Sequence, residues 1–126
     1  MTGQGEVLTG EGKWLEAASS ELGAPIPAQV ADKLRGKEFK TFNAFREAFW
    51  FAVANVPELF IQFKRGNLGN IKSGKAPSPK EVEQVGGRIK YELHHVKLIS
   101  EEGEVYNIDN IRVVTPKRHI EIHRGK

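Results

Sequence analysis

The chain has 126 residues, of which 39% are hydrophobic, and this is enough for one domain with a single modest core. It contains no run of about 18 apolar residues, so we expect no transmembrane helix and no stable membrane insertion. Because cysteine is absent, disulfides and thiolate metal sites are excluded, and a tight metal site must use histidine or carboxylate ligands.

The net charge of +3 is unevenly distributed along the chain. Residues 1–63 hold 6 Lys/Arg and 8 Asp/Glu, whereas residues 64–126 hold 13 and 8, which gives −2 and +5. The second half is therefore the better candidate for contact with a polyanion such as nucleic acid. Charge alone is weak evidence for such contact, because charged runs are usually solvated surface.

The sequence of the first half of the chain predicts mainly helices. Residues 1–12 are rich in glycine and polar residues and predict a flexible arm, with structure beginning near Trp14. A short helix is predicted over residues 28–34 and a longer one over residues 41–54, with Thr41 as N-cap. In the longer helix, apolar residues recur at three- and four-residue spacing, and we interpret them as core rather than as a base-stacking platform: Phe42, Phe45, Phe49, Ala52 and Val53.

The second half predicts loops followed by strands and one helix. Glycines and prolines interrupt residues 65–84, where Asn67 and Ser78 could cap only short helical turns. Thr115 and Pro116 predict the N-cap and first turn of a terminal helix that runs through His123. Before it, three short strands are predicted, with a loop at residues 101–104 after the second: residues 89–93, 96–99 and 111–114.

All four histidines lie in the stretch HHVKLISEEGEVYNIDNIRVVTPKRHIEIH, which spans residues 94–123. His119 and His123 are four residues apart on the predicted helix, so their side chains share one face and can converge on one ion. His94, at a strand end, can complete a three-imidazole site with a vacant fourth position, which is typical of a catalytic zinc site. A single pair of this kind is more often incidental, but the four histidines together favour metal binding.

Within this stretch the spacing is His-His, fourteen residues, Asn110, eight residues, His119, three residues and His123. This spacing resembles the extended HNH signature of the nuclease domains of DNase colicins and S-type pyocins. The flanking words GAPIP, ADKLRGKEFK, VGGR, YELHH and TPKRHIEIHRGK look the same, and the likeness runs from about Trp14 to the end. It implies an α+β fold, in which residues 1–126 form a single, mostly helical HNH endonuclease domain and residues 86–126 its C-terminal ββα-metal motif.

The resemblance assigns the histidines two roles. His94, His119 and His123 are expected to hold one divalent transition metal, and three neutral imidazoles suit zinc, nickel or cobalt better than magnesium. His95 is the implied general base that takes a proton from the attacking water. Strict strand alternation would aim His94 and His95 at opposite faces, so the strand must twist or end at this pair.

Other residues of the motif also receive roles from the resemblance. Arg88, which follows two glycines, offers a fork of donors to a phosphate and is implied in catalysis, although without the likeness an ordinary surface arginine is an equal interpretation. Glu92 shares strand parity with Arg88 and His94, so it can orient either one, and it too is implied in catalysis. Asn110 is expected to tie the loop between the two strands to the helix. Lys90 and Lys97 join Arg88 as expected nucleic-acid contacts.

The implied function is that of a bacteriocin endonuclease, which hydrolyses phosphodiester bonds of double-stranded DNA with little sequence specificity. It would be released from the producing bacterium as part of a larger toxin and act in the cytoplasm of a target bacterium. A cognate immunity protein would inhibit a domain that is otherwise monomeric. The inhibitor is expected on residues 65–84, and the candidate contacts are Lys72, Lys75, Pro77 and Ser78, although the aromatic anchors common there in the family are missing.

Two other functions stay open at this point. A zinc-stabilised, non-enzymatic DNA-binding module would keep its behaviour after His95→Ala, whereas a nuclease would lose cleavage and keep zinc. An RNA-cleaving enzyme is the second alternative, because sibling colicins attack RNA, although those siblings lack this signature.

Overall fold

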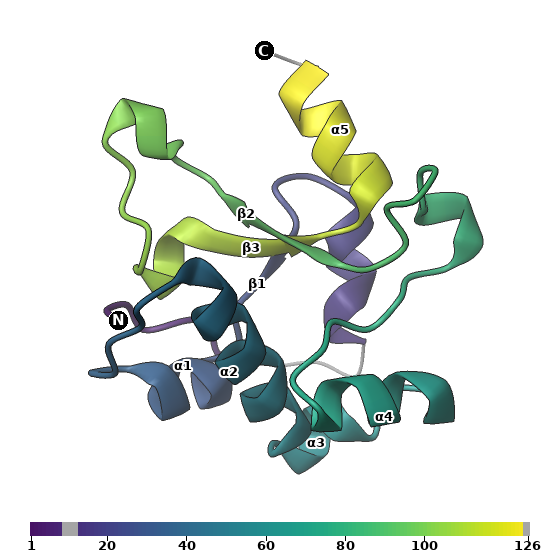
Figure 1. Cartoon of the computed structure of the whole chain (residues 1–126), viewed down its shortest axis with the longest axis horizontal. Coiled ribbons are helices and arrows are strands. Elements are labelled where there is room, and N and C mark those ends of the chain that lie inside the picture. Colours follow the sequence, from purple (N-terminus) through teal and green to yellow (C-terminus); the bar gives the residue numbers. More distant parts are fainter. Residues whose placement is uncertain (9–12, 125–126) are drawn as a thin grey trace.

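A computed structural model describes residues 1–8 and 13–124 of the chain. Short helices dominate it, and a small sheet joins them near the C-terminus (Figure 1). The prediction of an α+β fold, mostly helical, is therefore confirmed. The elements in chain order are η1 (Trp14–Ser19), β1 (Ala24–Pro25), α1 (Ala28–Leu34), α2 (Phe42–Ala54), α3 (Pro57–Phe60), α4 (Arg65–Lys72), η2 (Glu81–Glu83), β2 (Glu92–His95), η3 (Ile99–Glu101), η4 (Ile108–Asn110), β3 (Ile111–Val114) and α5 (Pro116–Arg124).

The sheet has three antiparallel strands in the order β1-β3-β2. The central strand β3 is buried except at Arg112, and its partner residues on β2 include His94, opposite Arg112, and His95, opposite Ile111. Helices α1 to α4 lie on one side of the sheet and α5 on the other (Figure 1). This arrangement sets the C-terminal helix directly above the strand that carries His94 and His95.

The core forms where α2 packs against the sheet, η1 and the other helices. Phe45, Phe49 and Trp50 of α2 are fully buried, and Trp14 of η1 packs against the last two with ring centroids 6.2 and 6.3 Å away. The interpretation of the α2 stripe as core is confirmed at Phe45, Phe49, Ala52 and Val53, which are buried. Phe42, at the start of the stripe, is only partly buried.

Three helices, and the caps of two of them, were predicted correctly. Helix α1 has the predicted bounds, and α2 begins after Thr41, whose side chain accepts a hydrogen bond from the Ala44 amide. Helix α5 begins at Pro116, and the Thr115 hydroxyl accepts from the Arg118 amide at 3.1 Å. These elements have their signals within a few neighbouring residues.

The strand predictions were partly wrong. Residues 96–99 are not a strand, because β2 ends at His95 and the chain turns away into η3. The strand predicted at residues 89–93 lies at Glu92–His95 instead. Residues 65–72, expected to form only loops and short turns, form the helix α4. Asn67 does not cap it: its side-chain amide exchanges two hydrogen bonds with the backbone of Ser78.

Residues 1–6 bond to the rest of the chain, where a flexible arm was expected. The Thr2 amide donates to the Tyr106 carbonyl at 2.9 Å, and the Gln4 and Gly5 amides donate to the Asp109 carboxylate. The expectation for residues 9–12 lies outside the described residues. The prediction failed because glycine-rich composition says nothing about hydrogen bonds made by the backbone.

Among the described residues, the helices are too short and too polar for any of them to cross a membrane.

Candidate metal and catalytic centre

Strand β2 and helix α5 bring three imidazoles together. His94 is 3% exposed on β2, and the ring centroids of His119 and His123 on α5 lie 5.1 and 5.6 Å from its own. One nitrogen from each ring lies within 4.8 Å of the others. Nitrogens that share a tetrahedral zinc at about 2.1 Å are roughly 3.4 Å apart, so small side-chain rotations suffice to bind one ion. The geometry and the donor set therefore fit a transition metal.

Glu92 holds one of these rings in a fixed orientation. Its Oε1 atom lies 2.8 Å from His119 Nδ1. Because a carboxylate oxygen accepts, Nδ1 carries the proton in this contact and Nε2 is left for a metal. Strand parity predicts that Glu92 orients Arg88 or His94, and in the structure its carboxylate bonds to Arg88 and to His119. Strand parity could not reveal His119, which lies 27 residues away.

The second contact of Glu92 is a bidentate ion pair with Arg88. Nε and Nη2 of Arg88 donate to the two carboxylate oxygens, the first at 2.9 Å. Burial raises the pKa of the Glu92 carboxyl, but hydrogen bonds from Arg88 and His119 outweigh burial and hold this pKa below its ordinary value. The same hydrogen bond raises the pKa of Arg88. Glu92 is therefore a carboxylate at neutral pH, and Arg88 stays a cation with a side chain 45% exposed.

His95 lies in the same pocket but faces a different neighbour. A pocket of about 220 Å³ is lined by Leu93, His94, His95, Leu98, Ile99, His119 and His123. The His95 Nε2 atom lies 3.0 Å from the Val105 carbonyl oxygen, and its ring packs 5.1 Å from that of Phe42. Because a carbonyl oxygen only accepts, Nε2 carries a proton in this contact, and Nδ1 is the ring nitrogen left as a possible acceptor. The end of β2 at His95 resolves the alternation problem raised by the sequence.

Val105 and Phe42 were not recognised from the sequence as neighbours of the site. Val105 contributes a backbone carbonyl, which no side-chain pattern marks. Phe42 belongs to the apolar stripe of α2, so its contact with an imidazole is indistinguishable from core packing in the sequence.

Asn110 ties the loop between β2 and β3 to its own ends. Its side chain accepts from the Lys97 amide at 2.7 Å and donates to the carbonyls of Lys97 and Glu104 at 3.1 and 3.0 Å. The expected link to helix α5 is replaced by these contacts, since Asn110 ends η4 just before β3. Asn110 thus shapes the loop that carries Leu98 and Ile99 to the pocket.

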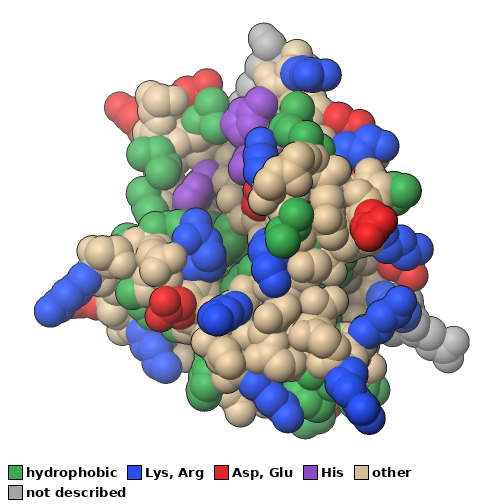
Figure 2. All heavy atoms as spheres, turned by 45° about the vertical axis from the view of Figure 1, so that its right-hand side comes forward, with side chains coloured by type: hydrophobic (Ala, Val, Ile, Leu, Met, Phe, Trp, Pro, Cys, Tyr) green, Lys and Arg blue, Asp and Glu red, His purple; other side chains and the backbone are tan. Residues whose placement is uncertain are grey.

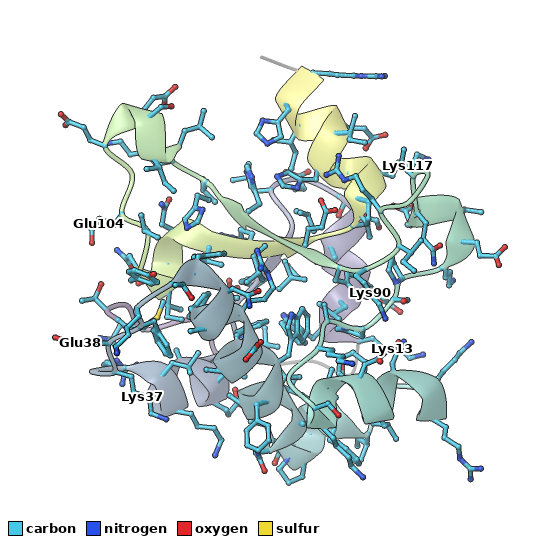
Figure 3. The ribbon with its side chains drawn as sticks, viewed as in Figure 1. Lys13, Lys37, Glu38, Lys90, Glu104 and Lys117 are labelled. Atoms are coloured by element: carbon cyan, nitrogen blue, oxygen red, sulfur yellow. The ribbon has the colours of Figure 1, made fainter. Side chains whose placement is uncertain are left out.

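Basic side chains lie near the histidines on one face of the molecule (Figure 2). Figure 2 shows the histidines gathered in its upper half, with Lys and Arg side chains around and below them. Lys90 is half-buried just before β2, and Figure 3 places it on the same side of the molecule as Lys117 of α5. Lys97 is exposed at the start of the loop after β2. All three expected nucleic-acid contacts, Arg88, Lys90 and Lys97, therefore belong to the segment around β2.

The candidate inhibitor contacts differ in their accessibility. Lys72 and Lys75 are exposed at the end of α4 and just beyond it, and Ser78 is half-buried. Pro77 is buried, and its carbonyl accepts from the Tyr91 amide at 2.9 Å. Pro77 is therefore a poor candidate for a direct contact, because its ring is already packed within the chain.

Comparison with known proteins fits this geometry: the family model described as the Colicin/Pyocin-S2 DNase domain matches residues 1–124. The chain belongs to the family of colicin and pyocin DNase domains. The resemblance inferred from the HNH spacing is confirmed, and the family match extends over residues 1–13, ahead of the sequence likeness that began near Trp14.

Individual members of the colicin and pyocin DNase family are closely similar. Pyocin-S2 of Pseudomonas aeruginosa is 57% identical over 124 residues, 98% of this chain and 18% of the pyocin. Colicin-E2 of Escherichia coli is 56% identical over 123 residues, 94% of this chain and 21% of the colicin. The crystal structure of the pyocin AP41 DNase-immunity complex matches with a TM-score of 0.94 and 46% identity, covering 99% of this chain and 96% of that chain. This chain spans about a fifth of the length of Colicin-E2 and Pyocin-S2.

Proposed function

We propose that this chain is the DNA-cleaving domain of a bacteriocin, a metal-dependent endonuclease that hydrolyses phosphodiester bonds with little sequence specificity. One observation carries the proposal: three imidazoles that can share an ion line the same pocket as a fourth whose Nδ1 can accept a proton. Metal ligands beside a proton acceptor are the groups that hydrolysis of a phosphodiester requires. Family membership supports the choice of DNA as substrate.

Each residue of the centre has a defined task in this proposal. His95 takes the proton of the attacking water at Nδ1, because its Nε2–H is already donated to the Val105 carbonyl. Arg88 presents the part of its guanidinium that Glu92 does not use to a phosphate oxygen. Glu92 keeps both Arg88 and His119 oriented.

His94, His119 and His123 would hold the metal. When bound, it would supply Lewis-acid stabilisation of negative charge on the phosphate and on the leaving 3′ oxygen. Neutral imidazoles favour zinc, nickel or cobalt over magnesium, and we propose zinc.

The partners follow from the same assignment. The pyocin AP41 structure is a complex of that DNase with an immunity protein, and we propose a cognate immunity protein for this chain. Residues 65–84 are its proposed contact segment, with exposed Lys72 and Lys75 as the accessible candidates. We also propose that the domain is delivered by a larger toxin and acts in the cytoplasm of a target bacterium. The chain matches only about a fifth of the length of Colicin-E2 and Pyocin-S2, and this supports delivery by a larger toxin.

Cleavage of supercoiled plasmid tests the proposal. The purified chain with zinc, nickel or cobalt should nick the plasmid, and a chelator should stop the reaction. His95→Ala should lower the rate by about 10²- to 10⁴-fold while zinc binding persists. Glu121→Ala, which removes an exposed carboxylate of α5, is the matched control and should cleave at the wild-type rate.

The alternatives predict other outcomes in the same assay. A non-enzymatic DNA-binding module would retain DNA without nicking it, and His95→Ala would change nothing. An RNA-cleaving enzyme would digest purified tRNA at least as fast as duplex DNA. Products that map to one defined DNA sequence would contradict the low sequence specificity, since phosphate contacts carry no base information.

A further inference from the structure

The first residues of the chain form a strap between the helical body and the loop beside His95. The strap (residues 2–6) pairs with the chain before β3, where the Thr2 amide donates to the Tyr106 carbonyl and the Thr2 carbonyl accepts from Ile108, at 2.9 and 2.8 Å. At its other end the Glu6 amide donates to Ile26 and its carbonyl accepts from Ala28. In Figure 1 the N-terminus lies beside the turn that leads into β3.

Asp109 fastens the strap. Its two carboxylate oxygens accept from consecutive amides, Gln4 at 3.1 Å and Gly5 at 3.0 Å, across more than one hundred positions of sequence. Charged acceptors make stronger hydrogen bonds than neutral ones. Asp109 is exposed, so it adds little to the hydrophobic core.

Glycine at position 3 permits this close approach. Gly3 has φ +101°, and a Cβ there would lie 2.7 Å from Asn107 Oδ1 and 2.9 Å from the Ile108 amide nitrogen. A residue with a side chain could adopt neither this backbone conformation nor this separation without strain. The strap and residues 107–109 therefore pack backbone against backbone.

The segment that the strap holds also carries the acceptor of His95. Val105 precedes Tyr106, so the carbonyl bonded to His95 Nε2 lies one residue from the carbonyl bonded to Thr2. Among the described residues, the backbone hydrogen bonds that reach residues 105–108 from outside the β2–β3 loop come from the strap. Asp109 is followed by Asn110, which closes the same loop. The strap therefore helps to position the Val105 carbonyl, together with the bond from Asn110 to the Glu104 carbonyl and the packing of the Tyr106 ring on α2.

We propose that Asp109 is a positioning residue for catalysis, which acts through the strap and the Val105 carbonyl to orient His95. The inference rests on the proposed nuclease function. General-base catalysis depends on the direction of the acceptor nitrogen, so a tilt of the His95 ring lowers turnover without removing metal or DNA contacts.

Asp109→Ala tests the inference. We expect kcat for duplex cleavage to fall by about 10- to 100-fold, with KM and zinc affinity unchanged. Glu58→Ala, which removes an exposed carboxylate on α3, is the matched control and should keep the wild-type kcat. Gly3→Ala displaces the strap from its other side and should give the same loss of kcat, so the inference stays testable if Asp109→Ala folds poorly.

A double-mutant comparison separates orientation of His95 from a general loss of structure. On the His95→Ala background, Asp109→Ala should cause no further loss of residual cleavage, because the group it orients is gone. A similar fold-loss on both backgrounds, or a wild-type kcat for Asp109→Ala, would overturn the inference. If the wild-type chain itself fails to cleave DNA, the proposed function fails instead, so the two failures are distinguishable.

Discussion

Glu92 serves two partners at once, one four and one 27 positions away in the chain. Its carboxylate fixes the proton of His119 on Nδ1 and the direction of the Arg88 guanidinium. A contact of this kind aligns a ligand before the metal arrives, so less ordering is needed on binding. Loss of the carboxylate should therefore lower the metal affinity more than it lowers the folding stability of the domain.

We predict that Glu92→Ala weakens zinc binding by about 10- to 100-fold, which is the usual effect of removing the hydrogen-bond partner of a metal ligand. Competition against a chromophoric chelator measures the affinity. Glu121→Ala is the control, because the Glu121 carboxylate lies on α5, as His119 does, but pairs with Arg118. Equal zinc affinity of wild type and Glu92→Ala would show that His119 needs no orienting partner.

Gly103 allows the loop after β2 to fold back on itself. A Cβ at this position would lie 1.9 Å from the Lys97 carbonyl oxygen, which accepts a hydrogen bond from Asn110. We predict that Gly103→Ala destabilises the domain by about 1–3 kcal/mol, as overpacking does elsewhere. Gly87→Ala, which meets no atom within 4 Å, should change stability by less than about 0.5 kcal/mol. Denaturant unfolding measures both, and equal stabilities would contradict the close approach.

At the scale of elements, the local sequence predicts helix α5 but not helix α4. The cap by Thr115, the proline after it and the histidine spacing all lie within nine residues, so α5 and two of its ligands were predictable. Helix α4 contains Gly66 and Gly69, which disfavour helix, and its stability comes from packing against α2. Its end is marked by Gly74, where amides of Gly74 and Lys75 bond back to Ile71 and Asn70 in a Schellman motif.

We therefore predict that Gly66→Ala and Gly69→Ala each stabilise the domain by about 0.5–1 kcal/mol. A Cβ at either position meets nothing within 4 Å. Gly74→Ala should have the opposite sign, since Gly74 has φ +76° and its Cβ would lie 3.1 Å from the Glu47 carbonyl oxygen. Thermal unfolding of the three variants checks the signs. A loss of stability in both helix variants would contradict this interpretation of α4.

What the sequence could not predict depends on contacts between distant segments. Strand β1 has only two residues and exists because β3 pairs with it. The bounds of β2 were misplaced because Ile89 and Tyr91 alternate with Lys90 as in a strand, although residues 89–91 pair with no strand. The histidine cluster was predictable because three of its features, residue type, spacing and helix periodicity, are local. The contacts of His95 with Val105 and of Glu92 with His119 join residues far apart in the sequence, so they were not predictable.

At the scale of the whole molecule, a shared metal would join strand β2 to helix α5. His94 belongs to the buried sheet, whereas His119 is half-buried and His123 exposed on α5. A ligand bound only by the folded state stabilises it in proportion to the logarithm of its concentration. Metal binding should therefore fasten α5 to the sheet and raise the stability of the whole domain.

We predict that zinc at 100 times its dissociation constant stabilises the chain by about 2.7 kcal/mol, which corresponds to a rise in Tm of about 5–15 °C. The rise should continue logarithmically with zinc concentration, because it reflects binding and not a fixed change in packing. His119→Ala should lose most of it, while Glu121→Ala, which leaves all three imidazoles in place, should keep it. Magnesium should have little effect, because it prefers oxygen ligands. Calorimetry in matched buffers measures these shifts, and an equal rise with magnesium or with His119→Ala would place the stabilising ion away from the three histidines.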